Sequence, residues 1–209
     1  MNSPDEEYRD RIVSAADRLY YARGFSSVGM DELRDESGVS LRRLYRLFPS
    51  KNDIVMAVLR GRRRMWTEGL AEYVDAVGPP EEKLLAVYDF LSGWFCEDDF
   101  RGCGFVNAFA ELGAVNPEVA EIAREHKASF QRDLERLVAE LGAEPSLAAQ
   151  LALLAEGAQT TAAISGDPVA ATHARRAART LVGAALAGRD AEAGVTGGRS
   201  PGADDRERP

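Results

Sequence analysis

The arginines of residues 42–46 are the side chains in this sequence best suited to binding an anion. Arg42, Arg43 and Arg46 lie within five residues, and no acidic residue separates them. In a helix that begins just before them, the helix dipole would disfavour the first two by about 0.3–1 kcal/mol each. A phosphate or a guanine edge would reverse that penalty, and Tyr45 adds a phenol that can donate to a phosphate or pack on a thymine methyl group. These residue types therefore indicate a surface that contacts nucleic acid, on which we expect at least one of the three arginines to bind a guanine.

A further cationic side chain stands at the start of the helix predicted to follow. Ser50 and Asp53 have the spacing of a capping box, in which a hydroxyl and a carboxylate satisfy backbone N–H groups at a helix N-terminus. The N–H groups left free at such an end attract anions, and Lys51 adds a full positive charge. We therefore expect Lys51 to contact a phosphate.

Two short helices joined by a tight turn must position these side chains. An apolar stripe predicts a first helix over residues 6–23. A second helix is predicted over residues 30–37 and is ended by Gly38, and Ser40 caps a third over residues 41–48. Two short helices separated by a glycine-containing turn are typical of a helix-turn-helix, whose second helix enters the major groove of DNA.

The rest of the chain is also predicted to be helical, so the expected fold class is all-α. The further helices are predicted over residues 51–77, 81–96, 105–113, 117–141, 146–165 and 168–187. We divide the chain into an N-terminal three-helix, helix-turn-helix domain (residues 1–50) and a larger C-terminal helical domain (residues 51–187) for ligand binding and dimerisation. The helix over residues 51–77 links the two. Residues 188–209 are almost devoid of apolar side chains and are predicted to be disordered.

Charge is distributed unevenly along the sequence. The whole chain has a net charge of −8, but residues 39–65 hold eight basic residues against Asp53 alone, a net of +7. A basic surface at one end of an acidic molecule is typical of a protein that binds a polyanion. Two alternatives are the solvated basic face of an ordinary helical bundle and a DNA-binding protein without sequence preference. The acidic C-terminal part disfavours the second of these.

The residue patterns that many enzymes need are missing from the sequence, so we expect a protein that binds rather than catalyses. We find no nucleophile–base pair, glycine-rich phosphate loop or metal-ligand spacing, and we expect no metal and no cofactor. No apolar stretch approaches the roughly 20 residues needed to span a membrane. The acidic N-terminus lacks the layout of a signal peptide, which favours a cytoplasmic location.

Several short motifs resemble the N-terminal signature of the TetR family of transcriptional regulators. They are Gly24-Phe25, Met30-Asp31-Glu32-Leu33, Gly38-Val39-Ser40, Leu44-Tyr45, Phe48-Pro49-Ser50-Lys51 and Ile54. The resemblance implies a homodimer that binds double-stranded operator DNA, and a divergent C-terminal domain that binds a small-molecule effector. It also implies the positions of six DNA contacts, five in the recognition helix and one in the phosphate-contacting turn. These are Ser40, Arg42, Arg43, Tyr45 and Arg46 in the helix, and Lys51 in the turn.

The sequence departs from the family pattern at three points. Val28-Gly29 stands where the family usually has a Thr or Ser, and Arg34 stands where a small residue is usual. Arg42-Arg43 replaces a commoner pair of small residues. These departures leave the operator sequence and the register on it open.

Aromatic residues in the C-terminal part indicate a cavity for the effector. The predicted binding residues are Trp66, Trp94, Phe105 and Phe109, with Asn107 and His126 as polar anchors. An apolar or aromatic effector is therefore expected, and the alternative for each aromatic residue is that it only fills the core. Cys103 as a sensor of oxidants or electrophiles is a further alternative, which its lone position beside Arg101 supports only weakly.

Alanine and leucine recur on the last two predicted helices, where small side chains permit close helix approach. They are Leu147, Leu151, Leu154, Ala158, Ala162, Ala170, Ala174, Ala177, Leu181 and Ala184. The family resemblance implies a four-helix dimer interface here, and the alternative is packing within one chain. We predict a repressor that its effector releases from the operator, with activation as the other possible output.

Overall fold

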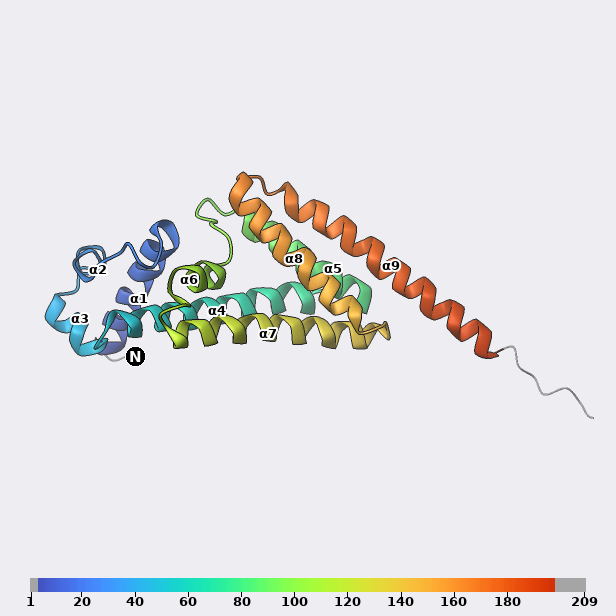
Figure 1. Cartoon of the computed structure of the whole chain (residues 1–209), viewed down its shortest axis with the longest axis horizontal. Helices are drawn as coiled ribbons and strands as arrows, with labels where there is room; N and C mark the ends of the chain where they lie inside the picture. The colour runs from blue at the N-terminus through green and yellow to red at the C-terminus, as the bar shows by residue number, and fades with distance from the viewer. Residues whose placement is uncertain (1–3, 198–209) are drawn as a thin grey trace, which may run out of the picture.

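The computed structural model describes residues 4–197, and the side chains of residues 4–189. Within that part the chain forms nine α-helices and no β-strand, so the predicted all-α class is confirmed. The helices are α1 (Pro4–Arg23), α2 (Met30–Ser37), α3 (Leu41–Leu47), α4 (Lys51–Asp75), α5 (Pro80–Phe95), α6 (Gly104–Leu112), α7 (Pro117–Leu141), α8 (Ser146–Ser165) and α9 (Val169–Gly197). Figure 1 shows an elongated molecule with α1–α3 at one end, α8 and α9 at the other, and α4 running between them.

Helices α1–α3 pack around a shared apolar cluster. Ile12, Ala16 and Tyr20 of α1 recur at helical spacing and are buried, as the sequence predicts. Leu33 of α2 and Leu44 of α3 meet them and are fully buried. The buried side of each helix fixes which residues its other side presents to solvent.

The turn between α2 and α3 depends on Gly38. This residue has a φ of 64°, in the left-handed region that favours glycine, and its N–H donates to the carbonyl of Arg34 at 2.9 Å. The predicted bounds of α2 are confirmed, and α3 ends at Leu47, one residue earlier than predicted. The helix-turn-helix geometry therefore follows from local sequence signals.

The start of α4 is fixed by the predicted capping box. The Ser50 hydroxyl accepts a hydrogen bond from the N–H of Asp53 at 3.2 Å, and the Ser50 N–H donates to the Asp53 carboxylate at 2.8 Å. The helix is continuous to Asp75, two residues short of the predicted end, and Gly78 and Pro79 follow it. It is the rod that connects the two ends of the molecule.

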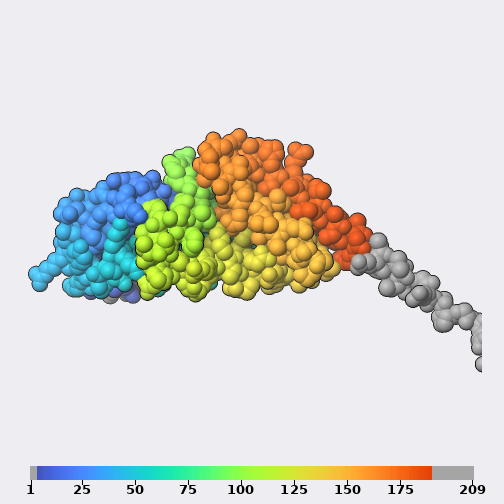
Figure 2. Space-filling view, viewed as in Figure 1, coloured from blue at the N-terminus to red at the C-terminus, as the bar shows by residue number. Residues whose placement is uncertain are grey.

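Two apolar clusters fill the molecule, and α4 contributes to both. The first holds α1–α3 and the first half of α4 together with Phe105 of α6 and Val119 of α7. The second lies among the end of α4 and helices α5, α7, α8 and α9. In the space-filling view, the green and yellow-green segment that includes α6 lies against the blue N-terminal helices (Figure 2). Because such interiors are close-packed, a shift of α6 would disturb the packing of α1–α3.

Helix α9 is longer than predicted. It continues to Gly197, whereas the sequence predicts an end at Ala187 and disorder over residues 188–209. Alanine and arginine are good helix formers, and the Arg189 guanidinium donates to the carbonyl of Leu141 at the end of α7 at 2.8 Å. The rest of the predicted disordered segment, residues 198–209, lies outside the described residues.

Three further findings concern the whole described part of the chain. No helix there has the length and apolar character that crossing a membrane requires. Nor does it contain a group of three or more His, Cys, Asp or Glu side chains arranged to hold a metal ion. Both cysteines are free thiols; Cys96 is exposed and Cys103 is buried.

Candidate nucleic-acid interface and ligand cavity

Helix α3 presents its polar side chains away from the core. Leu44 and Leu47 are buried on one side, while Arg42, Tyr45 and Arg46 are exposed on the other. Tyr45 leaves 49% of its surface exposed although it is aromatic. Figure 1 shows α3 at one end of the molecule, so this face is accessible to a large partner.

The three arginines of α3 differ in what holds them. The Arg46 guanidinium donates to the carboxylate of Asp5 on α1 at 2.6 Å. The Arg43 guanidinium lies over the ring of Tyr8, also on α1, 3.9 Å from its centroid. The exposed Arg42 makes no hydrogen bond, ion pair or ring contact with any residue that the structure describes. Helix α1 therefore orients two of the arginines and leaves the third free for a ligand.

The other two predicted DNA contacts differ in accessibility. Ser40 lies at the N-cap position of α3 as predicted, but its exposed hydroxyl makes no capping hydrogen bond. Lys51 is half-buried at the start of α4, where its amine donates to the carbonyl of Ser26 at 3.4 Å and lies 5.7 Å from the centroid of the Tyr20 ring. Burial lowers the pKa of Lys51. The ammonium has three N–H donors, so the bond to Ser26 leaves donors for a phosphate, and this contact stays a prediction.

Two arginines of the basic segment of residues 39–65 are paired with acids of other helices. Arg62 pairs with Asp17 of α1 at 2.5 Å, and Arg63 pairs with Glu125 of α7 at 2.8 Å. These two arginines neutralise acids of the same molecule. The net charge of +7 therefore overstates the positive charge that this segment offers to a partner, because a charge count cannot show which acids lie beside the arginines.

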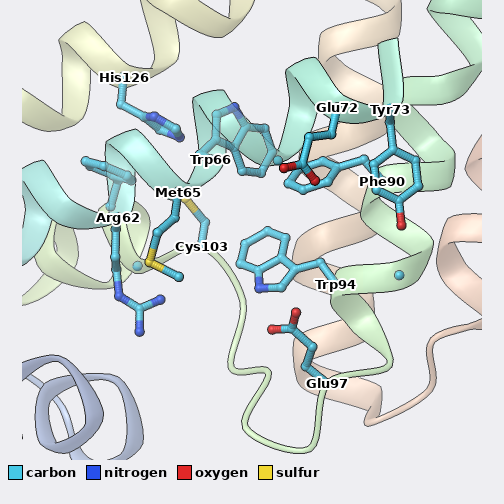
Figure 3. Close-up of a pocket in the computed structure, with 14 residues that line it drawn as sticks. Arg62, Met65, Trp66, Glu72, Tyr73, Phe90, Trp94, Glu97, Cys103 and His126 are labelled. Atoms are coloured by element: carbon cyan, nitrogen blue, oxygen red, sulfur yellow. The ribbon is translucent and has the colours of Figure 1, made fainter. Parts of the chain in front are cut away.

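A cavity of about 400 Å³ opens between α4 and α5, with the loop before α6 and part of α7 also contributing to its wall (Figure 3). Four of the six residues predicted to bind an effector lie in its wall: Trp66, Trp94, Phe105 and His126. Their contact with a ligand stays a prediction. The cavity lies in the half of the molecule that the sequence analysis assigns to the effector.

Asn107 and Phe109, the other two predicted effector residues, do not line this cavity. The Asn107 side-chain amide donates to the carbonyl of Arg101 at 3.2 Å, and 47% of the Phe109 surface is exposed. Asn107 is two positions after Phe105 and points about 200° away from it around α6. Phe109 lies on the same side of α6 as Phe105 but one turn farther along the helix, and it is not part of the cavity wall. The sequence prediction placed Asn107 and Phe109 in the same site as Phe105 because they are close to it in the sequence. Nearness in a helical sequence does not ensure that two side chains reach the same cavity.

Aromatic rings form the wall between α4 and α5. The Trp66 ring is nearly perpendicular to those of Phe90 and Trp94, with centroids 5.1 Å and 5.6 Å away. Tyr73 packs edge-on against Phe90 at 5.7 Å. Edge-to-face contacts of this kind fix the ring orientations, so the cavity is bordered by well-placed aromatic faces.

The sequence prediction omitted ten residues that line the cavity. They are Arg62, Met65, Gly69, Glu72 and Tyr73 of α4, Phe90, Gly93 and Glu97 at α5, and Cys103 and Gly104 before Phe105. Helical periodicity could have found Arg62, Gly69 and Tyr73 from Trp66, and Phe90 from Trp94, because residues three, four and seven apart lie on one helix face. The two glycines give room to rings of the opposite helix. A Cβ at Gly69 would lie 2.9 Å from Phe90, and one at Gly93 would lie 2.8 Å from the Tyr73 hydroxyl.

His126 is buried in the cavity wall. Its ring stacks on Phe105 with centroids 3.9 Å apart, and it meets the Trp66 ring edge-on at 5.4 Å. Burial, and then the positive charges of Lys127 and Arg63, lower the pKa of His126 to about 3. The imidazole is therefore uncharged at neutral pH and forms part of an aromatic wall.

Arg62 belongs both to the cavity wall and to the link with α1. Its guanidinium makes two hydrogen bonds to the Asp17 carboxylate, at 2.5 and 3.2 Å, and lies 3.7 Å from the centroid of the Tyr21 ring. The Tyr21 hydroxyl in turn donates to the carbonyl of Gly102 at 2.7 Å and accepts from the N–H of Arg101 at 2.9 Å. Displacement of Arg62 by a ligand would therefore loosen α1 from the wall of the cavity.

Helices α6 and α7 also contact the end of the molecule that carries α3. The Glu111 carboxylate of α6 accepts a hydrogen bond at 2.8 Å from the N–H of Ser26, in the turn that follows α1. Asn52, at the start of α4, donates to Glu118 of α7 at 2.5 Å and accepts from the side chain of Asn116. The position of α1–α4 thus depends on the position of α6 and α7.

The apolar faces of α8 and α9 pack largely within the chain. Six of the residues predicted for a dimer interface are buried in the monomer: Leu147, Leu151, Ala158, Ala162, Ala170 and Ala174. For these six the alternative, packing within one chain, is confirmed. Two large apolar side chains of α8 are instead exposed, Leu153 at 73% and Ile164 at 83%.

The fold and the α2–α3 unit define a helix-turn-helix protein with a second, larger helical region. Residues 12–58 match the family model described as bacterial regulatory proteins, tetR family. A crystallised TetR-family transcriptional regulator from Streptomyces coelicolor shares the fold with a TM-score of 0.81 and 26% sequence identity, over 87% of this chain and 97% of that one. Residues 12–58 thus match the TetR family of regulatory proteins, and the fold of the chain is similar to that of a TetR-family transcriptional regulator.

Curated relatives match over shorter segments. The HTH-type transcriptional activator FasR from Mycolicibacterium smegmatis is 29% identical over 117 residues, which are 56% of this chain and 52% of that protein. An uncharacterized HTH-type transcriptional regulator from Mycobacterium tuberculosis is 38% identical over 79 residues, which are 37% of this chain and 39% of that protein. The chain thus spans about half of the first relative and less of the second.

Proposed function

We propose that this chain is a sequence-specific, ligand-responsive repressor that binds operator DNA as a homodimer and is released by a small molecule. It acts in the cytoplasm and is not an enzyme. One curated relative is named an activator, so activation is the second candidate output. The proposal has three parts, which are DNA binding, dimerisation and coupling to a ligand.

The exposed face of α3 is the observation that carries the DNA-binding part. Arg42, Tyr45 and Arg46 point to solvent there, and Arg43 and Arg46 are oriented by contacts to α1. Side chains held in place before binding lose less conformational entropy on binding. Arginine bound to guanine is the commonest specific contact in the major groove, which favours sequence-specific recognition over binding to phosphates alone.

The dimer part rests on geometry and on the exposed side chains of α8. A helix-turn-helix dimer places its two recognition helices in successive major grooves, about 34–36 Å apart. Leu153 and Ile164 are exposed on α8, a helix that lies apart from α3 (Figure 1), so two copies could associate through α8 and leave both α3 helices free. Burial of exposed apolar side chains in a dimer is favourable by about 25 cal/mol per Å².

The ligand part rests on the position of Arg62. A molecule that entered the cavity and contacted Arg62 would compete with Asp17 for the guanidinium and so weaken the link between α4 and α1. Helix α1 holds Arg43 and Arg46, so a shift of α1 would disturb the face that reads DNA. A ligand acts in this way only as far as it prefers one of the two arrangements.

Sequencing the DNA fragments that the protein retains at moderate salt, with random duplex as competitor, tests the function directly. We expect the retained fragments to share a palindrome whose half-sites are centred about one helical turn apart. Fragments without a common motif would instead identify a DNA-binding protein without sequence preference. Transcription from a promoter that carries the recovered operator then separates repression from activation.

The Asp17→Asn variant tests the proposed coupling once a ligand has been found by its effect on thermal stability. We expect the ligand to bind this variant but to change its operator affinity less than that of the wild type. Asp10→Asn is the matched control, because Asp10 lies exposed on the same helix. An unchanged ligand response in Asp17→Asn would exclude the ion pair as the coupling element.

A further inference from the structure

The wall of the cavity contains both acidic and basic side chains, but only the acidic ones lack a partner of opposite charge. The guanidinium of Arg62 is neutralised by Asp17, and burial keeps His126 uncharged at neutral pH. Glu72 and Glu97 are different. They are exposed lining residues, and neither carboxylate has a hydrogen bond or an ion pair with any residue that the structure describes. The cavity therefore has two uncompensated negative charges at its rim.

Both carboxylates border the aromatic part of the wall. Glu72 precedes Tyr73 on α4, and Glu97 stands three residues after Trp94, two residues beyond the end of α5. In the close-up, the Glu97 carboxylate is drawn beside the Trp94 ring, and the Glu72 carboxylate is drawn over the Phe90 ring (Figure 3). The half-buried Trp94 ring also lies almost parallel to Phe90, at an interplanar angle of 17°. The electron-rich faces of such rings attract cations, with Trp the strongest of the three aromatic residues.

We propose that the cavity between α4 and α5 binds an organic cation with an apolar body, such as a substituted ammonium ion, whose charge lies between Glu72, Glu97 and the ring of Trp94. This inference rests on the proposed function, because it names the chemical class of the effector. It narrows the expectation of an apolar or aromatic molecule by adding a positive charge. At about 400 Å³ the cavity has the size of a site for a small molecule.

The other classes of occupant fit the same walls less well. An anion would meet the two carboxylates and would have to separate Arg62 from Asp17 to find a partner. A neutral aromatic molecule would fill the apolar space but would leave both carboxylates without a partner. Of the three classes, only an organic cation can interact favourably with both the aromatic rings and the two carboxylates.

Binding of three probes of similar shape to the full chain without DNA, measured by calorimetry, tests this inference. The probes are phenyltrimethylammonium, its neutral isostere tert-butylbenzene, and the anion 4-tert-butylbenzoate. We expect the cation to bind at least about tenfold more tightly than the neutral isostere, because cation–π and ionic contacts are added to the same apolar burial. Equal or tighter binding of the neutral probe or of the anion would overturn the proposal, and so would the absence of any binding by the cation.

Variants of Glu72 and Glu97 test whether the preference for the cation arises at these two carboxylates. In Glu72→Gln and Glu97→Gln we expect the preference for the cation over its neutral isostere to fall about threefold each, as expected for partly exposed ionic contacts. Glu68→Gln is the matched control, since Glu68 is exposed on α4 but does not line this cavity. The ratio of the two affinities is measured within each variant, so a general loss of stability does not imitate the result. An unchanged ratio in both cavity variants would place the cation elsewhere and refute the site.

Operator binding in the presence of phenyltrimethylammonium separates this inference from the proposed function. Cation binding in the cavity without any change of operator affinity would support the chemical class and contradict the ligand-responsive part of the function. Release of the operator by tert-butylbenzene or 4-tert-butylbenzoate, but not by the cation, would support ligand response and overturn the inference made here.

Discussion

Acidification should destabilise this protein through His126. Above pH 6.5 the imidazole is uncharged in both the folded and the unfolded chain, so it contributes nothing to the pH dependence. Below pH 6.5 the unfolded chain takes up a proton that the folded chain does not, because burial holds the folded pKa of His126 at about 3. The free energy of unfolding therefore falls by about 1.4 kcal/mol per pH unit, or about 3 kcal/mol between pH 6.5 and pH 4.

Urea unfolding at fixed protein concentration and at several pH values measures this loss. The carboxylates also begin to titrate in acid, so the quantity of interest is the difference between the wild type and His126→Phe, which keeps a ring against Phe105 and Trp66. We expect the variant to lose about 3 kcal/mol less between pH 6.5 and pH 4. His173→Phe is the control, because it makes the same replacement at an exposed position. Parallel curves for wild type and His126→Phe would show that His126 is protonated in the folded protein and would refute the reasoning.

The remaining predictions concern DNA, assembly and the effector. Replacing Arg42 by Ala should cost about 1–3 kcal/mol on the operator and relax preference at one position, which single-mismatch operators would detect; a uniform loss would assign Arg42 to phosphate. Lys51→Ala should weaken operator and random duplex equally and lower the salt slope by about one unit per subunit, and altered base preference would contradict its role. Light scattering should give about 45 kDa, twice the 22.7 kDa of one chain, with Leu153→Glu and Ile164→Glu shifting the mass towards the monomer. Trp94→Ala should abolish the rise in melting temperature that the effector causes, and a normal response would move the ligand elsewhere.

Much of the fold could be predicted because its boundaries are set by local signals. Gly38 ends α2 through its own left-handed conformation, and the Ser50–Asp53 capping box starts α4. These signals lie within four residues of the boundary they fix. The predicted end of α9 was wrong because no local signal fixes it. Instead, a contact between Arg189 and Leu141, which are 48 residues apart in the sequence, accompanies the longer helix.

The candidate site was less predictable because its parts come from distant segments. Arg62 meets Asp17 across 45 residues, and Glu111 meets Ser26 across 85. Residue type alone identified Trp66 as a cavity residue, but it could not tell that Arg62 is neutralised while Glu97 is not. The proposed class of effector depends on this difference between a paired arginine and an unpaired glutamate. The difference becomes visible only in the packing of α4 against α1 and α5.

The proposed coupling between the cavity and the exposed face of α3 must work in both directions. If a ligand lowers operator affinity by some factor, the operator must lower ligand affinity by the same factor, since both changes share one coupling free energy. Breaking the Arg62–Asp17 contact should therefore reduce both effects equally. Glu111 and Asn52 provide a second route from α6 and α7 to the same end of the molecule. An Asp17→Asn variant that kept half of the reciprocal effect would assign the rest to this second route, because the two sets of contacts join different helices to α1–α4.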